Sequence, residues 1–315
     1  MKKHNSCNRW SELFGLSVIF CTVIILFSSC ISMPNARKVE ALSLLDDNSN
    51  LYFSIPNNVD NELLEKILKE RVSGITEKEI ERILTRINTV YAGIDISRRI
   101  FSTDAVQISV DGNIPKKMVP KLLNKKNGWE VITCSSECAK KHPIYTKQII
   151  QGSDEYINVA FPSNNIACAG RDIEKMLSRY DDFSSIDFLP EMQEENESIM
   201  LKNEYFYNYL LESNDEIRFF TNNPNTFLSY LIGVNVDLRI LTIAGAIVKD
   251  DEDTTKYKMK LMFKFSSNKF LKAGRAILKL AFGFSNKEVE DGDDSELIIQ
   301  NVQISKEQIY KLLSL

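Results

Sequence analysis

The chain has 315 residues and a formal net charge of −4, from 39 Lys and Arg residues against 43 Asp and Glu residues. A mildly acidic chain is attracted only weakly to the phosphates of nucleic acids, so we expect no nucleic-acid partner. The length allows one large domain or two smaller ones, each with a sizeable core.

The N-terminus has the order of a secretory signal. Lys2, Lys3 and Arg9 precede an uncharged, mostly apolar run from Leu13 to Phe27. A membrane-spanning helix needs about 20 apolar residues, so the run is short for a span and favours a cleaved signal peptide over residues 1–29. An uncleaved signal anchor is the alternative.

Small residues precede a cysteine at the end of this run, in the stretch Phe27-Ser28-Ser29-Cys30. The stretch resembles the lipobox of bacterial lipoproteins, in which the cysteine is acylated and becomes the first mature residue. The resemblance implies that Cys30 carries acyl chains such as palmitate, which makes membrane lipid a partner and leaves the polypeptide in the aqueous envelope or periplasm. Ile31 and Ser32 follow in place of an aspartate, which favours the cell outer membrane. Residues 30–50 are predicted to be a tether.

Strands and amphipathic helices alternate in the predicted first lobe, residues 51–180. Apolar residues at helical spacing predict a helix around Leu63 to Leu68 and another after Thr76, where TEKE has the form of a capping box. Further helices are predicted at 115–125 and 171–180. Runs rich in β-branched and aromatic residues predict strands at 51–56, 89–97, 105–110, 129–134, 144–150 and 156–161.

An acidic stretch interrupted by Pro190 predicts a linker at residues 181–200. Residues 201–315 then repeat the order of the first lobe, including a strand, Asn-Asn turn and helix, a strand with an Ala-Gly pair, and a strand running into a basic helix. This order favours an internal duplication, although few residues are identical. We therefore predict an α+β fold of two similar lobes with amphipathic helices on a mixed or antiparallel sheet, which the lobes can share as one long sheet.

Three further cysteines of the mature chain are candidates for a disulfide, which the envelope permits: Cys134, Cys138 and Cys168. One bridge among them leaves one thiol free. Four-residue spacings also place His142 beside Cys134 and Cys138, but a zinc site is disfavoured because the paired short spacings of structural zinc sites are missing. His142, which follows two lysines, is expected in a solvated loop.

The stretch Asn268 to Ser285 predicts a helix with four basic residues on a stripe of about 120°. Its uncharged arc exceeds the stripe that one contact with a sheet needs, and contains Phe270, Leu271, Ile277, Leu278, Leu280, Phe282 and Phe284. One interpretation is an interfacial helix on membrane lipid. The other is a helix lodged in the core, for which Gly274 permits close packing. The lipid-contact candidates are Lys269, Phe270, Lys272, Arg275, Leu278, Lys279 and Phe282.

A lipobox together with duplicated α+β lobes and amphipathic helices looks like the treponemal outer-membrane lipoproteins whose helices insert into the bilayer. The resemblance implies lipid contact and assigns no residue. No H-E-x-x-H, G-x-S-x-G or Gly-rich phosphate motif occurs, and the acidic run Asp250 to Thr255 lacks the pattern of an EF-hand. We expect no enzymatic activity, metal or cofactor. The alternative to lipid contact is an envelope protein-protein interaction or structural module with all helices internal.

Overall fold

The computed structural model describes residues 38–46, 48–71, 76–96, 105–132, 141–148, 156–185, 204–213, 215–232, 237–283, 289–292 and 295–313. The strands are β1 (Leu51–Pro56), β2 (Ile87–Ile94), β3 (Val106–Gly112), β4 (Glu130–Ile132), β5 (Ile144–Gln148), β6 (Tyr156–Ala160), β7 (Ile166–Gly170), β8 (Ile217–Thr221), β9 (Ile240–Lys249), β10 (Lys256–Phe265), β11 (Val289–Asp291) and β12 (Glu296–Ser305). The helices are η1 (Ala41–Leu44), α2 (Asn61–Arg71), α3 (Glu77–Leu84), η3 (Lys116–Met118), α4 (Val119–Leu122), η4 (Lys125–Asn127), α6 (Ile173–Ser184), α9 (Glu204–Leu211), α10 (Pro224–Ile232), α11 (Asn268–Phe282) and α12 (Lys306–Leu313).

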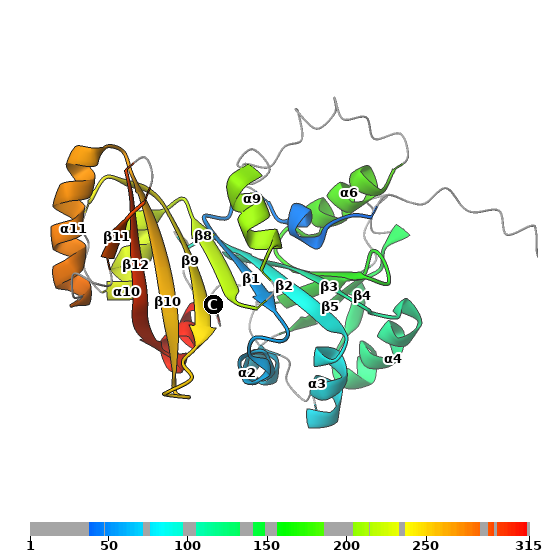
Figure 1. Ribbon diagram of the computed structural model, residues 1–315. Helices are drawn as coiled ribbons and strands as arrows, with labels where there is room; N and C mark the ends of the chain where they lie inside the picture. Colours follow the sequence, from blue (N-terminus) through cyan, green and yellow to red (C-terminus); the bar gives the residue numbers. More distant parts are fainter. Residues whose placement is uncertain are drawn as a thin grey trace, which may run out of the picture.

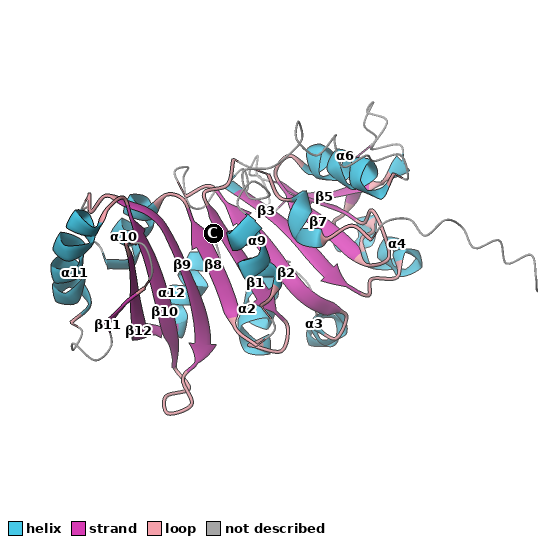
Figure 2. Cartoon of the chain, turned by 45° about the horizontal axis from the view of Figure 1, so that its top comes forward, coloured by secondary structure: helices cyan, strands magenta, loops and turns pink. Residues whose placement is uncertain are grey.

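All described strands belong to one 12-stranded sheet with the order β11-β12-β10-β9-β8-β1-β2-β3-β7-β6-β5-β4. Neighbouring strands are antiparallel, and the two halves of the chain meet in the middle, where Phe53 of β1 is opposite Phe219 of β8. Helices cover both faces of this twisted sheet (Figures 1 and 2). The predicted α+β class and the shared long sheet are confirmed.

The internal duplication stays a prediction. The strand order is symmetric about the β1–β8 pair, because β2 and β3 follow β1 on one side as β9 and β10 follow β8 on the other. The last helix of each half breaks the match, however. Ile173 of α6 and Ile309 of α12 belong to different hydrophobic clusters, which lie on opposite faces of the sheet.

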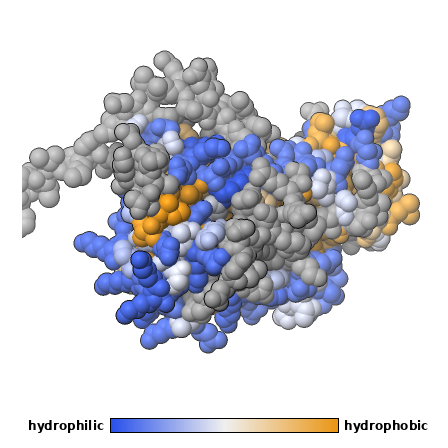
Figure 3. Space-filling model, turned by 180° about the vertical axis from the view of Figure 1, so that it is seen from behind, coloured by the Kyte–Doolittle hydropathy of each residue, from blue (hydrophilic) through white to orange (hydrophobic). Residues whose placement is uncertain are grey.

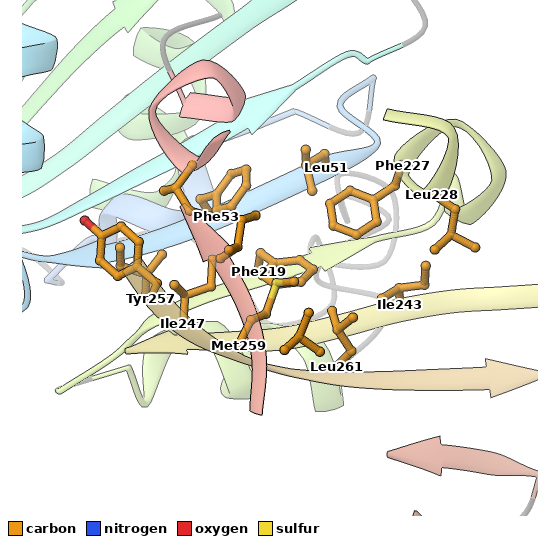
Figure 4. Close-up of a cluster of buried hydrophobic side chains, with 14 of the residues drawn as sticks. Leu51, Phe53, Phe219, Phe227, Leu228, Ile243, Ile247, Tyr257, Met259 and Leu261 are labelled. Atoms are coloured by element: carbon orange, nitrogen blue, oxygen red, sulfur yellow. The ribbon is translucent and has the colours of Figure 1, made fainter. Parts of the chain in front are cut away.

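The larger core lies on one face of the sheet, beneath α2, α3, α10, α11 and α12. Aromatic rings meet at its centre, where the ring centroids of Phe53 and Phe219 are 5.9 Å apart and those of Phe219 and Phe227 are 5.2 Å apart. Tyr257, Met259 and the neighbouring aliphatic side chains close around them (Figure 4). Fully burying a side chain of this size contributes about 1.5–3 kcal/mol, so this cluster dominates the stability of the sheet.

Asp60 joins the two halves beside this core. Its side chain is fully buried and caps α2 by accepting hydrogen bonds from the backbone N–H of Glu62 and Leu63. Its other oxygen accepts the hydroxyl of Tyr257 at 2.6 Å. Burial alone would raise the pKa of Asp60, but these hydrogen bonds and the charges of Lys249 and Lys306 outweigh it and hold the pKa below its usual value.

The second core, on the opposite face, includes a segment that we expected in the tether. Val39, Leu42, Leu44 and Leu45 are buried against α6 and α9, so the tether ends before Val39. A long-range ion pair helps to hold this segment on the fold. Asp46 Oδ1 accepts a hydrogen bond at 2.7 Å from Arg171 Nη2, and both side chains are buried. Because Arg171 lies 125 residues away, the local sequence does not reveal this contact.

Candidate membrane-contact helix

Ser267 and Gly283 define the two ends of α11. It directly follows β10, and Ser267 at its N-cap has an extended backbone from which the carbonyl oxygen accepts the N–H of Leu271 at 3.0 Å. Gly283 ends the helix in a left-handed conformation with φ 66°, which glycine adopts without strain. The described helix therefore covers the first 15 residues of the predicted stretch, and Phe284 lies outside the described residues.

One stripe of α11 packs into the larger core. Leu271 and Leu278 are buried, with Leu278 0% exposed, and the half-buried Phe282 packs against the same cluster. A Cβ atom on Gly274 would lie 2.3 Å from the ring of Phe265, so glycine permits the close approach of helix and strand. The core alternative therefore holds for Leu278, whereas Phe282, which keeps part of its surface exposed, stays a lipid-contact candidate.

A second apolar stripe of α11 points to solvent. We call Phe270, Ile277 and Leu280 the outer stripe; their exposed fractions are 39%, 38% and 84%. The seven-residue step from Phe270 to Ile277 and the three-residue step to Leu280 keep them on one face of the helix. Ile277 and Leu280 lie on the predicted uncharged arc but were not among the predicted lipid-contact residues.

The basic residues of α11 differ in their surroundings. Arg275 forms a two-point ion pair with Asp291 of β11, with two N–O distances of 3.2 Å. Lys269 and Lys272 are exposed and form no ion pair with any residue that the structure describes. Lys279 is half-buried in the last turn. The helix thus presents two unpaired ammonium groups together with the outer stripe.

Of the three cysteines that are candidates for a disulfide, the structure describes Cys168 alone. Cys168 is a buried free thiol on β7, and burial raises its pKa to about 12. Cys134 and Cys138 lie outside the described residues, as does Cys30. Among the described residues, no group of three or more His, Cys, Asp or Glu is placed to hold a metal ion.

His142 is buried, which corrects its expected solvation. Its Nε2 lies 2.9 Å from Asp181 Oδ1, and Lys141 Nζ lies 2.7 Å from the same oxygen. Burial would raise the pKa of Asp181, but the hydrogen bonds from Lys141 and His142 outweigh it and lower that pKa. Asp181 belongs to α6, so the helix includes residues 181–184 of the predicted linker. This cluster is a structural link between β5 and α6.

Within the described ranges, none of the helices combines the length and the apolar character that crossing a bilayer requires.

A family model described as outer membrane-associated lipoprotein TP0453 matches residues 36–310. Two solved structures of the treponemal lipoprotein TP0453 share the fold. Crystal form I has a TM-score of 0.60 at 14% identity, covering 89% of this chain and 98% of that one. Crystal form IV has a TM-score of 0.56 at 15% identity, covering 88% and 98%. No curated protein matches the sequence.

Proposed function

The chain belongs to the TP0453 family of outer membrane-associated lipoproteins, which places it in the cell envelope, and on that premise we propose that it contacts membrane lipid through α11. The observation that carries the proposal is the outer stripe, with Leu280 84% exposed beside two unpaired lysines. The proposal assigns the protein no enzymatic activity.

The energetics favour an interfacial position for such a helix. Moving a fully exposed Leu, Ile or Phe side chain out of water contributes about 1.5–3 kcal/mol. Leu280, at 84% exposure, would gain most of this amount, whereas Phe270 and Ile277, at 39% and 38% exposure, would each gain less than half of it. Lys269 and Lys272 lie on the same helix and would meet the phosphates of anionic headgroups. Surface binding then needs no unfolding of α11, because its core stripe stays on the sheet.

Acylation of Cys30 is part of the proposal. Each methylene buried in the bilayer contributes about 0.8 kcal/mol, so two or three acyl chains hold a protein firmly at a membrane. Eight Cα–Cα intervals separate Cys30 from Lys38, where the described chain begins, so an extended tether reaches at most about 27 Å at ~3.4 Å per interval. The fold therefore stays close to the lipid that carries its anchor.

An interface with a partner helix in another envelope protein is the second candidate function. It is favoured by one observation, the seven-residue spacing of Phe270 and Ile277, which suits the seam between two packed helices. In that case the outer stripe would be covered by protein rather than by lipid.

Flotation with anionic liposomes tests the proposal, using the unacylated chain from Ile31, which retains every described residue. Ile277→Ser with Leu280→Ser should weaken liposome binding and leave thermal unfolding unchanged. The matched control, Leu241→Ser with Val248→Ser, alters exposed apolar residues of β9 and should bind like the parent. Equal binding by the parent and the α11 variant would refute lipid contact through the outer stripe and favour the partner helix.

A further inference from the structure

A second exposed basic surface lies at the opposite end of the sheet from α11. The basic segment, residues 115–128, runs through η3, α4 and η4 and contains five lysines but no Asp or Glu. Lys117, Lys121, Lys125 and Lys126 are exposed and have no ion-pair partner among the described residues. Most other lysines of the sheet are neutralised locally, as Lys258 is by Asp250 at 3.0 Å.

The basic segment is held in place by the fold. Val119 and Trp129 are buried at 5% and 4% exposure and pack with Tyr145 in a small third cluster. The side chain of Asn124 accepts the N–H of Lys126 at 2.9 Å, and Gly128 turns the chain with φ 77°. Two buried anchors and a capped turn therefore present the lysines on a fixed scaffold rather than on a loose loop.

Apolar side chains accompany these lysines. Met118 is 40% exposed and Leu122 is 37% exposed, and Val131 on the adjacent edge strand β4 is 57% exposed. Seen from behind, a patch of hydrophobic atoms lies in the half of the molecule opposite α11, next to hydrophilic atoms (Figure 3). The basic segment thus combines unpaired ammonium groups with partly exposed apolar groups.

The basic segment and α11 cover the same face of the sheet. Ile144 points to the second core under α6, and Tyr145 packs with Val119 of α4. Consecutive residues of a strand point to opposite faces, so α4 lies on the face away from α6, where α2, α3 and α11 also lie. Figure 1 shows α2, α3 and α4 on the side of the sheet opposite α6 and α9.

We infer that the basic segment is a docking surface for anionic lipid headgroups, separate from the outer stripe of α11. Charge complementarity carries this assignment: clusters of about four to eight unpaired Lys or Arg residues at a membrane surface bind anionic lipid. The family places the protein at the outer membrane, so a lipid surface is the nearest extended source of negative charge. The inference does not require that α11 contact lipid.

The test compares the unacylated chain from Ile31 with a variant carrying Lys117→Gln, Lys121→Gln, Lys125→Gln and Lys126→Gln. Binding is measured by flotation with vesicles of phosphatidylglycerol and phosphatidylcholine, and with phosphatidylcholine alone. A scattered control carries Lys38→Gln, Lys78→Gln, Lys175→Gln and Lys260→Gln, which removes the same charge from other exposed sites. Both variants should keep the thermal unfolding of the parent, since the substituted side chains are exposed.

Each lysine near an anionic surface changes affinity by roughly fivefold, so the basic-segment variant should bind anionic vesicles at least ~10-fold more weakly than the scattered control. The difference should shrink at high salt. Inorganic phosphate, compared with chloride at equal ionic strength, should compete no better than chloride; competition by phosphate alone would identify free phosphate as the ligand and overturn the assignment.

The outcomes for the two membrane proposals are distinguishable. Loss of binding in the basic-segment variant with binding kept in the α11 variant would support the docking surface and refute lipid contact by the outer stripe. The reverse result would overturn the docking surface and leave α11 standing. If the parent protein does not bind anionic vesicles even at low salt, the docking surface for lipid is also overturned. The partner of the basic segment should then be sought among acidic envelope proteins.

Discussion

Leu278 and Leu280 lie two residues apart on α11 but should respond to the same substitution in opposite ways. Leu278 is 0% exposed in the larger core, and removing a buried leucine side chain costs about 2–5 kcal/mol through lost burial and the cavity left behind. Leu280 is 84% exposed, and truncating an exposed side chain changes stability by about 0.5 kcal/mol or less. We therefore expect Leu278→Ala to lower the melting temperature by roughly 6 °C or more, and Leu280→Ala to leave it unchanged.

Membrane binding should show the inverse pattern. If Leu280 enters the acyl boundary, replacing it with alanine removes about 2 kcal/mol of transfer free energy, or up to roughly 30-fold in vesicle partitioning. Leu278→Ala should partition like the parent below its melting temperature. Circular dichroism melts and flotation of both variants provide the measurement. Equal destabilisation by the two substitutions would show that α11 does not pack as described, and equal partitioning would exclude Leu280 from the contact.

Three further predictions concern the fold. Gly274→Ala should destabilise the protein by about 1–3 kcal/mol in urea unfolding, because its Cβ would lie 2.3 Å from the buried ring of Phe265. A second substitution, Phe265→Leu, should recover part of this loss. If Gly274→Ala leaves stability unchanged, the close approach of helix and strand is contradicted. Arg171→Met should lower the free energy of unfolding by about 3–5 kcal/mol, because it leaves the Asp46 carboxylate buried without its cationic partner. Adding Asp46→Asn should restore stability. A double variant as unstable as Arg171→Met would contradict the ion pair. The pKa of Asp60 is lowered in the folded state, so its ionised carboxylate stabilises the fold above its unfolded pKa of about 3.9, and this stabilisation is lost as the pH falls through the folded pKa. Asp60→Asn should therefore make the free energy of unfolding depend less on pH below about pH 4. An unchanged pH dependence in that range would refute this role.

Local patterns predicted the elements better than their arrangement. The strand over residues 51–56 is confirmed as β1, and the capping box at Thr76 is confirmed by the bond from Glu79 N–H to the Thr76 hydroxyl. The pairing of β1 with β8 joins residues more than 160 positions apart, and no periodicity specifies such a partner. The buried η1 segment was missed for the same reason, since polar residues beside it suggested a tether and their partner Arg171 lies far along the chain.

The sequence predicted the excess apolar surface of α11 but not which part of it faces the sheet. The wheel of residues 268–285 revealed more apolar surface than one contact needs, and α11 does carry two apolar stripes. Which stripe faces the sheet depends on how Phe265 fits against Gly274, a contact between two elements that the sequence order of either alone does not specify. The glycine was the available signal, because in the middle of a helix it marks a close approach of another side chain.

The charges of α11 provide an independent reason to look for an external anion. The N-terminal end of a helix carries a partial positive charge, which favours acidic residues by about 0.3–1 kcal/mol each and disfavours basic ones. Lys269 lies in the first turn and Lys272 follows in the second, while the first turn contains no acidic residue. Helix stability therefore does not account for these two lysines, and no described carboxylate neutralises them. Leu280, at 84% exposure, likewise adds little to folding, so contact with an anionic, apolar boundary would bury a side chain and neutralise two charges that the fold leaves in water.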